Sequence, residues 1–439
     1  MSRPRPSWRR AVLAPTALAA ALASVAAASA LTPPQITPRP KVEALAKAID
    51  TRFFDAPRAH RIAAELRAEA KKGVYDKLTD PRDFAAALTE RLRPLDGHFS
   101  VSWTPPGPTT SQRGPSGPPS FLARRGGYGF AAVRILPGNI GYIDMRGFAH
   151  FEPTGDQAAR RAADAALALV AGTDAVIFDL RENFGGSPAM VGYLIGHFTP
   201  DGAKIYNTFK TRGEPDGDEG PTVPITTQRR LETPLYVLTS GRTASAAESF
   251  AYTLQAAKRA TVVGEASRGG ANPGGSAPLD DGLSVFISSG TPINPITGTN
   301  WEGTGVIPDV PTTADEALAQ AQRLALAKLV SAPLGEPALT ENRWTLEALE
   351  AHPQIAHERL AAYAGGYGPF EAAVDGKVLV LRYGRQPQNV LTPLDENGLF
   401  FVAGAPSRRI QFDPDGLIFL SPDGSQTRQM RNGAAAAGR

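Results

Sequence analysis

The chain has 439 residues, no cysteine and a formal net charge of +3, and its first 30 residues hold four arginines and no acidic residue. The lack of cysteine excludes a disulfide framework, a thiol nucleophile and a lipid anchor on cysteine. The remaining residues carry a formal charge of −1, so we expect no basic surface for a nucleic acid or an anionic membrane, and their number favours two to three domains.

Residues 1–30 have the pattern of a signal peptide. The arginines precede an apolar stretch at 11–28, and Ala28-Ser29-Ala30 fits the small-x-small pattern of a cleavage site. We therefore predict export by the Sec or the twin-arginine route, cleavage after Ala30, and a periplasmic or extracellular protein. No later stretch has the roughly 18 apolar residues of a membrane span, so none is expected after signal removal.

Residues 31–103 are predicted to form an N-terminal helical domain. Apolar residues recur there at helical spacing, as at Val42, Leu45 and Ile49. Residues 104–126 are rich in proline, glycine and serine, which predicts a flexible linker.

The pattern changes at residues 127–330, where short apolar runs alternate with helical spacing. This alternation predicts a layered α/β core with a largely buried sheet. The expected strands lie at 130–136, 140–145, 175–180, 235–239, 261–264 and 283–288, and the expected helices at 156–171, 188–198, 245–258 and 313–330.

A linker at 331–342 is expected to lead to a small C-terminal β domain at 343–432, followed by a disordered tail at 433–439. Short apolar runs in this domain are separated by Asp-Gly pairs at 375, 415 and 423, which are typical of hairpin turns. The segment is similar to small β domains appended to serine hydrolases, a similarity that implies no chemistry.

The segment 234–258 joins an apolar strand, a turn of small residues and a helix, with Ser245 at the turn. Backbone N–H groups in the first turn of a helix lack intrahelical partners and can stabilise negative charge on a substrate carbonyl. Ser245 is therefore a candidate nucleophile. A serine before a helix is also a common helix cap, and this segment alone does not separate the two roles.

A second turn, RENFGG at 181–186, follows the strand expected at 175–180. The glycine pair lets the backbone approach a ligand closely, so the two turns together could supply an oxyanion hole. A plain strand-to-helix turn would have the same composition. We consider Arg181 and Asn183 as residues that shape this turn, and Glu248 as a site contact or a contact of the first helical turn.

Four blocks follow one another along the chain: DLRENFGG at 179–186, TASAAES at 243–249, VVGEASRGG at 262–270 and WEGTGVIPDV at 301–310. Together they resemble the signature blocks of peptidase family S41, which includes tail-specific and C-terminal processing proteases, tricorn protease and the retinoid-binding repeats. The resemblance covers about 95–330 and implies a ClpP/crotonase-like core. It also implies Ser245 as nucleophile and an oxyanion hole from the N–H of Ala246 with that of Gly185 or Gly186.

The chain differs from the branch of this family that has a Ser-Lys dyad and a PDZ domain. The block that carries the lysine in that branch matches Gly269-Gly270 here, and no lysine lies between Lys258 and Lys328. LDGHFS at 95–100 is similar instead to the histidine block of the tricorn-like branch. The resemblance thus implies His98 as the general base and Glu302 of the last block as its orienting carboxylate. Tricorn protease has a serine beside its histidine, where Gly97 stands here, so either Ser100 takes that place or Glu302 reaches the imidazole directly.

The function implied is hydrolysis of peptide bonds through an acyl-enzyme on Ser245, with a peptide or protein substrate and with no cofactor or metal. Two alternatives stay open from the sequence. One is a binding protein that holds an apolar ligand without turnover, and the other is an esterase or amidase that acts on small molecules. The sequence sets no oligomeric state.

Overall fold

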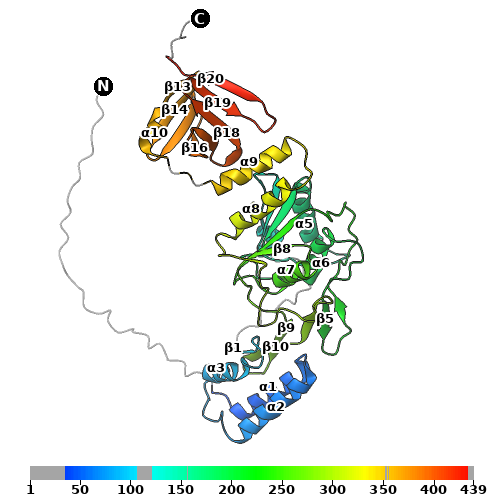
Figure 1. Cartoon of the computed structure of the whole chain (residues 1–439). Helices are drawn as coiled ribbons and strands as arrows, with labels where there is room; N and C mark the ends of the chain where they lie inside the picture. The colour runs from blue at the N-terminus through cyan, green and yellow to red at the C-terminus, as the bar shows by residue number, and fades with distance from the viewer. Residues whose placement is uncertain (1–34, 106–120, 156, 352, 354, 434–439) are drawn as a thin grey trace, which may run out of the picture.

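The computed structural model describes residues 35–105, 121–155, 157–351, 353 and 355–433 (Figure 1). The expected signal peptide, most of the expected linker at 104–126 and most of the expected tail lie outside these residues. Along the chain, the described residues form a helical part, an α/β core and a C-terminal antiparallel sheet. The predicted fold class, a layered α/β core with a small β domain after it, is confirmed.

The described core is built on a six-stranded sheet in the order β12-β8-β7-β4-β3-β2. Strand β2 runs antiparallel to β3, and the other neighbours are parallel. The bounds are β2 Phe130–Leu136, β3 Ile140–Met145, β4 Ala175–Asp179, β7 Leu235–Thr239, β8 Thr261–Gly264 and β12 Val310–Pro311.

Helices cover both faces of this sheet, which is why β3, β4 and β7 are buried along their whole length. On one face, residues such as Val176 and Phe178 pack against α5, α6 and α7. On the other, Ala175 and Ile177 pack against α8. The bounds are α5 Ala158–Leu169, α6 Pro188–Gly196, α7 Ala246–Ala256 and α8 Ala317–Val330.

A smaller sheet, β1-β10-β9, connects the N-terminal helices to the core. Strand β1 pairs antiparallel with β10, with Ser100 opposite Phe286, and its buried side chains share one apolar cluster with α1, α2 and α3. This pairing holds His98, two residues before β1, against the core. The bounds are α1 Pro38–Arg52, α2 Ala56–Lys71, α3 Pro81–Leu92, β1 Ser100–Trp103, β9 Gly274–Pro278 and β10 Leu283–Ser288.

Several shorter elements complete this part of the chain. Strands β5, β6 and β11 form a three-stranded sheet, and α4 and η1 precede β2. The bounds are α4 Phe121–Arg125, η1 Gly127–Gly129, β5 Thr208–Thr211, β6 Gly217–Asp218 and β11 Gly290–Ile293.

The C-terminal sheet has eight described strands, each paired with the next along the chain. A bridge between Tyr367 and Arg431 joins its two ends and closes the sheet into a barrel around Phe400 and Phe412. The bounds are α9 Ala338–Glu350, α10 His357–Ala362, β13 Gly365–Tyr367, β14 Phe370–Asp375, β15 Val378–Tyr383, β16 Asn389–Pro393, β17 Leu399–Val402, β18 Ala405–Asp413, β19 Gly416–Leu420 and β20 Gln426–Met430.

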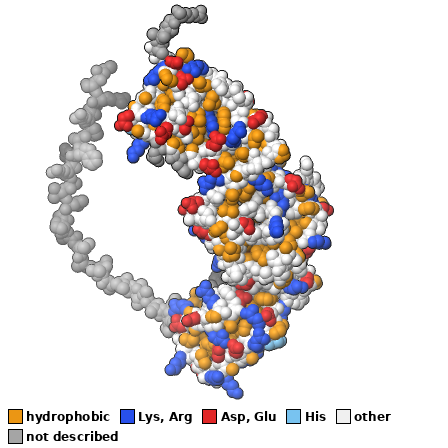
Figure 2. All heavy atoms as spheres, viewed as in Figure 1, with side chains coloured by type: hydrophobic (Ala, Val, Ile, Leu, Met, Phe, Trp, Pro, Cys, Tyr) orange, Lys and Arg blue, Asp and Glu red, His pale blue; other side chains and the backbone are white. Residues whose placement is uncertain are grey.

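Helix α9 packs against both α8 and the barrel, and Arg409 of β18 donates a hydrogen bond to Glu347 of α9. On the face shown in Figure 2, acidic and basic side chains are interspersed. None of the described helices has the length and apolar character needed to cross a membrane.

Candidate active site

Ser245 is the N-cap residue of α7, but its backbone does not have the conformation of an ordinary cap. Its φ is 56° and its ψ is −121°, whereas N-cap residues normally lie in the extended region. A residue with a side chain adopts a positive φ at an energetic cost, and such strained residues cluster at functional sites. The strain therefore favours the role of nucleophile over that of a simple cap.

Glu248 holds this strained turn in place. Its carboxylate is fully buried and accepts hydrogen bonds from the backbone N–H of Ser245 at 2.7 Å, from that of Gly269 at 2.6 Å and from that of Gly270 at 3.0 Å. The Ser267 hydroxyl donates a further hydrogen bond to it at 2.6 Å. Glu248 thus connects the Ser245 turn to the 267–270 loop, and its contact with the Ser245 N–H is the capping-box contact expected of the first helical turn.

The glycine turn packs directly on Ser245. Strands β4 and β7 are parallel neighbours, so the turns that follow them lie side by side. A Cβ atom on Gly185 would lie 2.7 Å from Ser245 Cβ and 3.0 Å from the backbone nitrogen of Ala246. Only glycine permits so close an approach.

The structure separates the two glycines as oxyanion-hole candidates. The Gly185 N–H donates a 2.8 Å hydrogen bond to Asn183 Oδ1, so it is already in use. Among the described residues, no hydrogen bond is donated by the N–H of Gly186 or by that of Ala246. Gly186 and Ala246 are therefore the better pair of donors for a developing oxyanion.

Asn183 and Arg181 have different surroundings. Asn183 is buried, and besides the Gly185 bond its side chain donates to the Met145 carbonyl at 3.0 Å, so it links the glycine turn to the end of β3. Arg181 instead forms an ion pair with Asp179 at 2.6 Å and donates to the Ala314 carbonyl at 2.5 Å. Its guanidinium contacts the end of β4 and residue 314, not the glycine turn.

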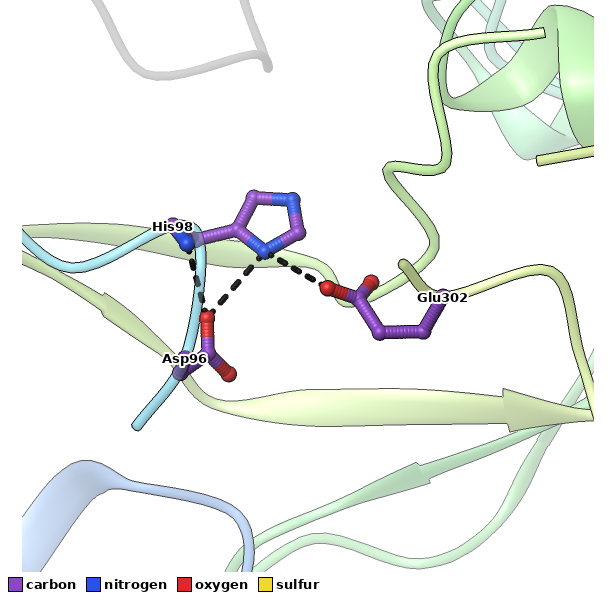
Figure 3. A group of neighbouring side chains, drawn as sticks. All are labelled: Asp96, His98 and Glu302. Carbon is purple, nitrogen blue, oxygen red and sulfur yellow. Dashed lines mark hydrogen bonds and ion pairs between the residues drawn. The ribbon is translucent and has the colours of Figure 1, made fainter. Parts of the chain in front are cut away.

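His98 has a carboxylate on each side of its Nδ1 atom (Figure 3). Asp96 Oδ1 and Glu302 Oε1 each lie 3.2 Å from Nδ1. The other oxygen of Glu302 accepts the N–H groups of Ala271 at 2.8 Å and Asn272 at 3.0 Å, which fixes this carboxylate in place. Glu302 thus reaches the imidazole directly.

Asp96 lies in the block LDGHFS at 95–100, but the sequence alone assigned it no role in the site. Its side chain is 4% exposed, and its Oδ1 also accepts the His98 backbone N–H at 2.8 Å and the Ser288 hydroxyl at 3.3 Å. The Asp-x-His spacing was the available signal, since an aspartate commonly accepts the N–H two residues further on.

Charge on the two carboxylates changes the ionisation of His98. Hydrogen bonds to Asp96 and then to Glu302 raise the pKa of His98 to about 10, although burial opposes this shift. Burial alone would raise the pKa of Asp96, but its contacts with His98 outweigh burial and lower that pKa. The imidazolium form of His98 is thus strongly stabilised.

The Nε2 atom of His98 lies beside Gly270, in the loop that Glu248 connects to the Ser245 turn. A Cβ atom on Gly270 would lie 3.5 Å from His98 Nε2 and 3.7 Å from Glu248 Oε2, the atom that accepts the Ser245 N–H. Among the described residues, no hydrogen bond joins the side chains of Ser245 and His98. Catalytic contacts of this kind often tighten only when substrate binds. The structure thus brings together Ser245, Glu248, His98, Asp96 and Glu302.

Residues 139–312 match the family model for peptidase family S41. The matched region contains Ser245, the glycine turn and Glu302, and it begins after His98. The chain is similar to a solved lipoprotein structure from Streptococcus agalactiae, at 15% identity over 67% of this chain and 97% of that one, with a TM-score of 0.47.

Two further solved structures are similar over part of the chain. The photosystem II D1 C-terminal processing protease is 17% identical over 66% of this chain and 98% of its own, with a TM-score of 0.41. Tricorn protease is 17% identical over 42% of this chain and 16% of its own, with a TM-score of 0.29.

Proposed function

Because residues 139–312 match the model of peptidase family S41, we propose that this chain is an exported serine peptidase that cleaves peptide bonds in peptides or proteins. The observation that carries the proposal is the strained backbone of Ser245 at the start of α7, packed against the glycine turn. A binding protein needs no strained serine beside two free backbone donors, so we favour catalysis over binding.

In the proposed reaction, neutral His98 accepts the hydroxyl proton of Ser245 through Nε2 as Oγ attacks the carbonyl carbon of the substrate. The N–H groups of Ala246 and Gly186 stabilise the oxyanion. His98 then donates its proton to the leaving amine. Water, deprotonated by His98, then attacks the acyl carbon, the ester bond to Ser245 Oγ breaks, and His98 returns the proton to Oγ as the second product leaves.

The two carboxylates support this proton transfer. Both accept from the Nδ1–H of His98, which leaves the Nε2 lone pair free for the serine proton, and both stabilise the imidazolium that forms. Because the same contacts hold His98 in its protonated form at neutral pH, the rate is expected to be higher at alkaline pH.

Hydrolysis of a denatured protein, followed by mass spectrometry of the fragments, tests the proposal. Ser245→Ala should lower kcat/KM by at least about 1000-fold, because only substrate binding and the oxyanion hole remain. Ser331→Ala, an exposed serine at the end of α8, is the matched control and should retain full activity. Unchanged hydrolysis by Ser245→Ala would refute the assignment, and turnover of small esters alone would make the chain an esterase.

A further inference from the structure

Asp96, His98 and Glu302 form a compact set of donor atoms in which two carboxylates meet one imidazole nitrogen (Figure 3). One nitrogen or oxygen atom of each of the three side chains lies within 4.8 Å of the corresponding atoms of the other two. One carboxylate is sufficient to orient a catalytic histidine. The second carboxylate therefore calls for a separate explanation.

The spacing of these atoms suits a small divalent cation. Zinc binds imidazole nitrogen and carboxylate oxygen at about 2.0 to 2.2 Å, so two ligands of a tetrahedral site lie about 3.4 Å apart. Both nitrogen-to-oxygen distances at His98 are 3.2 Å, close to that separation. Zinc also accepts one nitrogen and two oxygen donors more readily than magnesium or calcium, which prefer oxygen alone.

The ligands are held by surrounding groups, as is usual for metal-binding side chains. Glu302 uses its Oε2 atom to accept two backbone N–H groups, which leaves Oε1 directed at His98. Asp96 is fixed by the backbone N–H of His98 and by the Ser288 hydroxyl. Little rearrangement is needed for a cation to take the place of the Nδ1 proton between them.

We propose that Asp96, His98 and Glu302 bind one zinc ion, and that bound zinc switches off the peptidase. The inhibition, but not the zinc binding, rests on the proposed function. Zinc takes the lone pair of Nδ1. From the imidazolium the Nδ1 proton is released to solvent, and from the neutral Nδ1–H form it is replaced by a proton on Nε2. A neutral imidazole bound to metal through Nδ1 keeps its remaining proton on Nε2. Nε2 then has no lone pair for the Ser245 proton, so the metal-bound and active forms exclude each other.

Titration of the full chain with zinc chloride, followed by isothermal calorimetry, tests binding without using activity. The wild type should bind one zinc ion, and Ser245→Ala should bind it with the same affinity. Asp96→Asn and Glu302→Gln should each weaken binding at least about tenfold. Glu152→Gln is the matched control, because Glu152 pairs with His150 at 2.8 Å and no second carboxylate joins this described pair. The Glu152→Gln variant should bind zinc as tightly as the wild type.

Peptide hydrolysis by the wild type should fall as zinc is added and recover with a chelator. Absence of stoichiometric zinc binding, or equal binding by folded Asp96→Asn and Glu302→Gln proteins, would overturn the site. Zinc bound at this site without loss of activity would overturn the switch. Full hydrolysis by Ser245→Ala would refute the proposed nucleophile and leave the calorimetric result standing, so the two failures are distinguishable.

Discussion

At the scale of single residues, the site depends on a close approach between two backbone turns. Gly185 has a φ of 101°, and any side chain there would meet Ser245 Cβ and the backbone around Ala246 at 3.0 Å or less. The obstacle is mostly backbone, which cannot rotate away as a long side chain can. Small displacements of reacting groups have large effects on rate.

We expect Gly185→Ala to lower kcat/KM by about 100-fold, because the added methyl group must displace Ser245 and Ala246. Gly241→Ala is the matched control, since Gly241 lies in the same turn as Ser245 and its Cβ position is open. Steady-state hydrolysis by both purified variants checks this. Equal activity of the two variants would show that the close packing of the glycine turn is not needed for catalysis.

The sequence predicted more about the identity of the site residues than about their contacts. Ser245, His98 and Glu302 were identified by resemblance, and their catalytic roles stay proposals. The assignment of Gly186 over Gly185 needed the hydrogen bond from Gly185 to Asn183, which no spacing reveals. The Asp-x-His spacing indicated a contact of Asp96 with the backbone N–H of His98, but not the approach of Asp96 to the imidazole, which depends on the fold.

At the scale of elements, α7 is held from two sides. Its first turn binds the 267–270 loop through Glu248, and its next turns reach a buried polar cluster through Ser249 and Thr253. In that cluster Glu219 Oε2 accepts hydrogen bonds from Asn207 and Ser249, while its Oε1 is buried without a partner among the described residues. Burial raises the pKa of Glu219 from 4.5 to about 7.

Glu219 should therefore make stability depend on pH. The folded protein holds the proton on the Glu219 carboxyl more tightly than the unfolded chain does. The resulting stabilisation of the folded state is complete below pH 4.5 and is lost as the pH rises through about 7. The pKa shift corresponds to roughly 3 kcal/mol. Glu219→Gln carries no charge and keeps a carbonyl acceptor, so we expect it to remove this part of the pH dependence.

Thermal unfolding of the wild type and of Glu219→Gln across this pH range is the measurement. Glu214→Gln, an exposed residue between β5 and β6, serves as the control and should follow the wild type. Parallel pH profiles for wild type and Glu219→Gln would show that the buried carboxyl does not titrate in this range.

Elements with their own apolar pattern were predicted well. The expected strands at 235–239, 261–264 and 283–288 coincide with β7, β8 and β10. Strand β9 was missed, because Gly-Gly-Ser-Ala-Pro has no apolar alternation and becomes a strand only through its pairing with β10. The short strands β5 and β12 depend on partners distant in the sequence, β11 and β8, and β6 depends on its pairing with β5.

At the scale of the whole molecule, His98 and Ser245 come from different parts of the chain. The pairing of β1 with β10 joins the N-terminal helices to the core and thereby holds the proposed base near the nucleophile. No local pattern in the sequence predicted this pairing. The closure of the C-terminal strands into a barrel likewise depends on a contact between Tyr367 and Arg431.

Export also concerns the whole chain, and it remains a proposal because residues 1–34 lie outside the described part. We expect the mature protein to begin at Leu31, after cleavage behind Ala30. Mass spectrometry of protein from the periplasm or the medium would show this. Recovery only of chains that retain the first 30 residues, from the cytoplasm, would contradict it.

The most direct test of the central claim is covalent labelling of the nucleophile. A fluorophosphonate reacts with an activated serine hydroxyl, and mass spectrometry of the digested protein locates the modified residue. We predict one adduct, on Ser245, that is absent from the folded Ser245→Ala variant. An unlabelled wild type, or equal labelling of Ser245→Ala, would contradict the account.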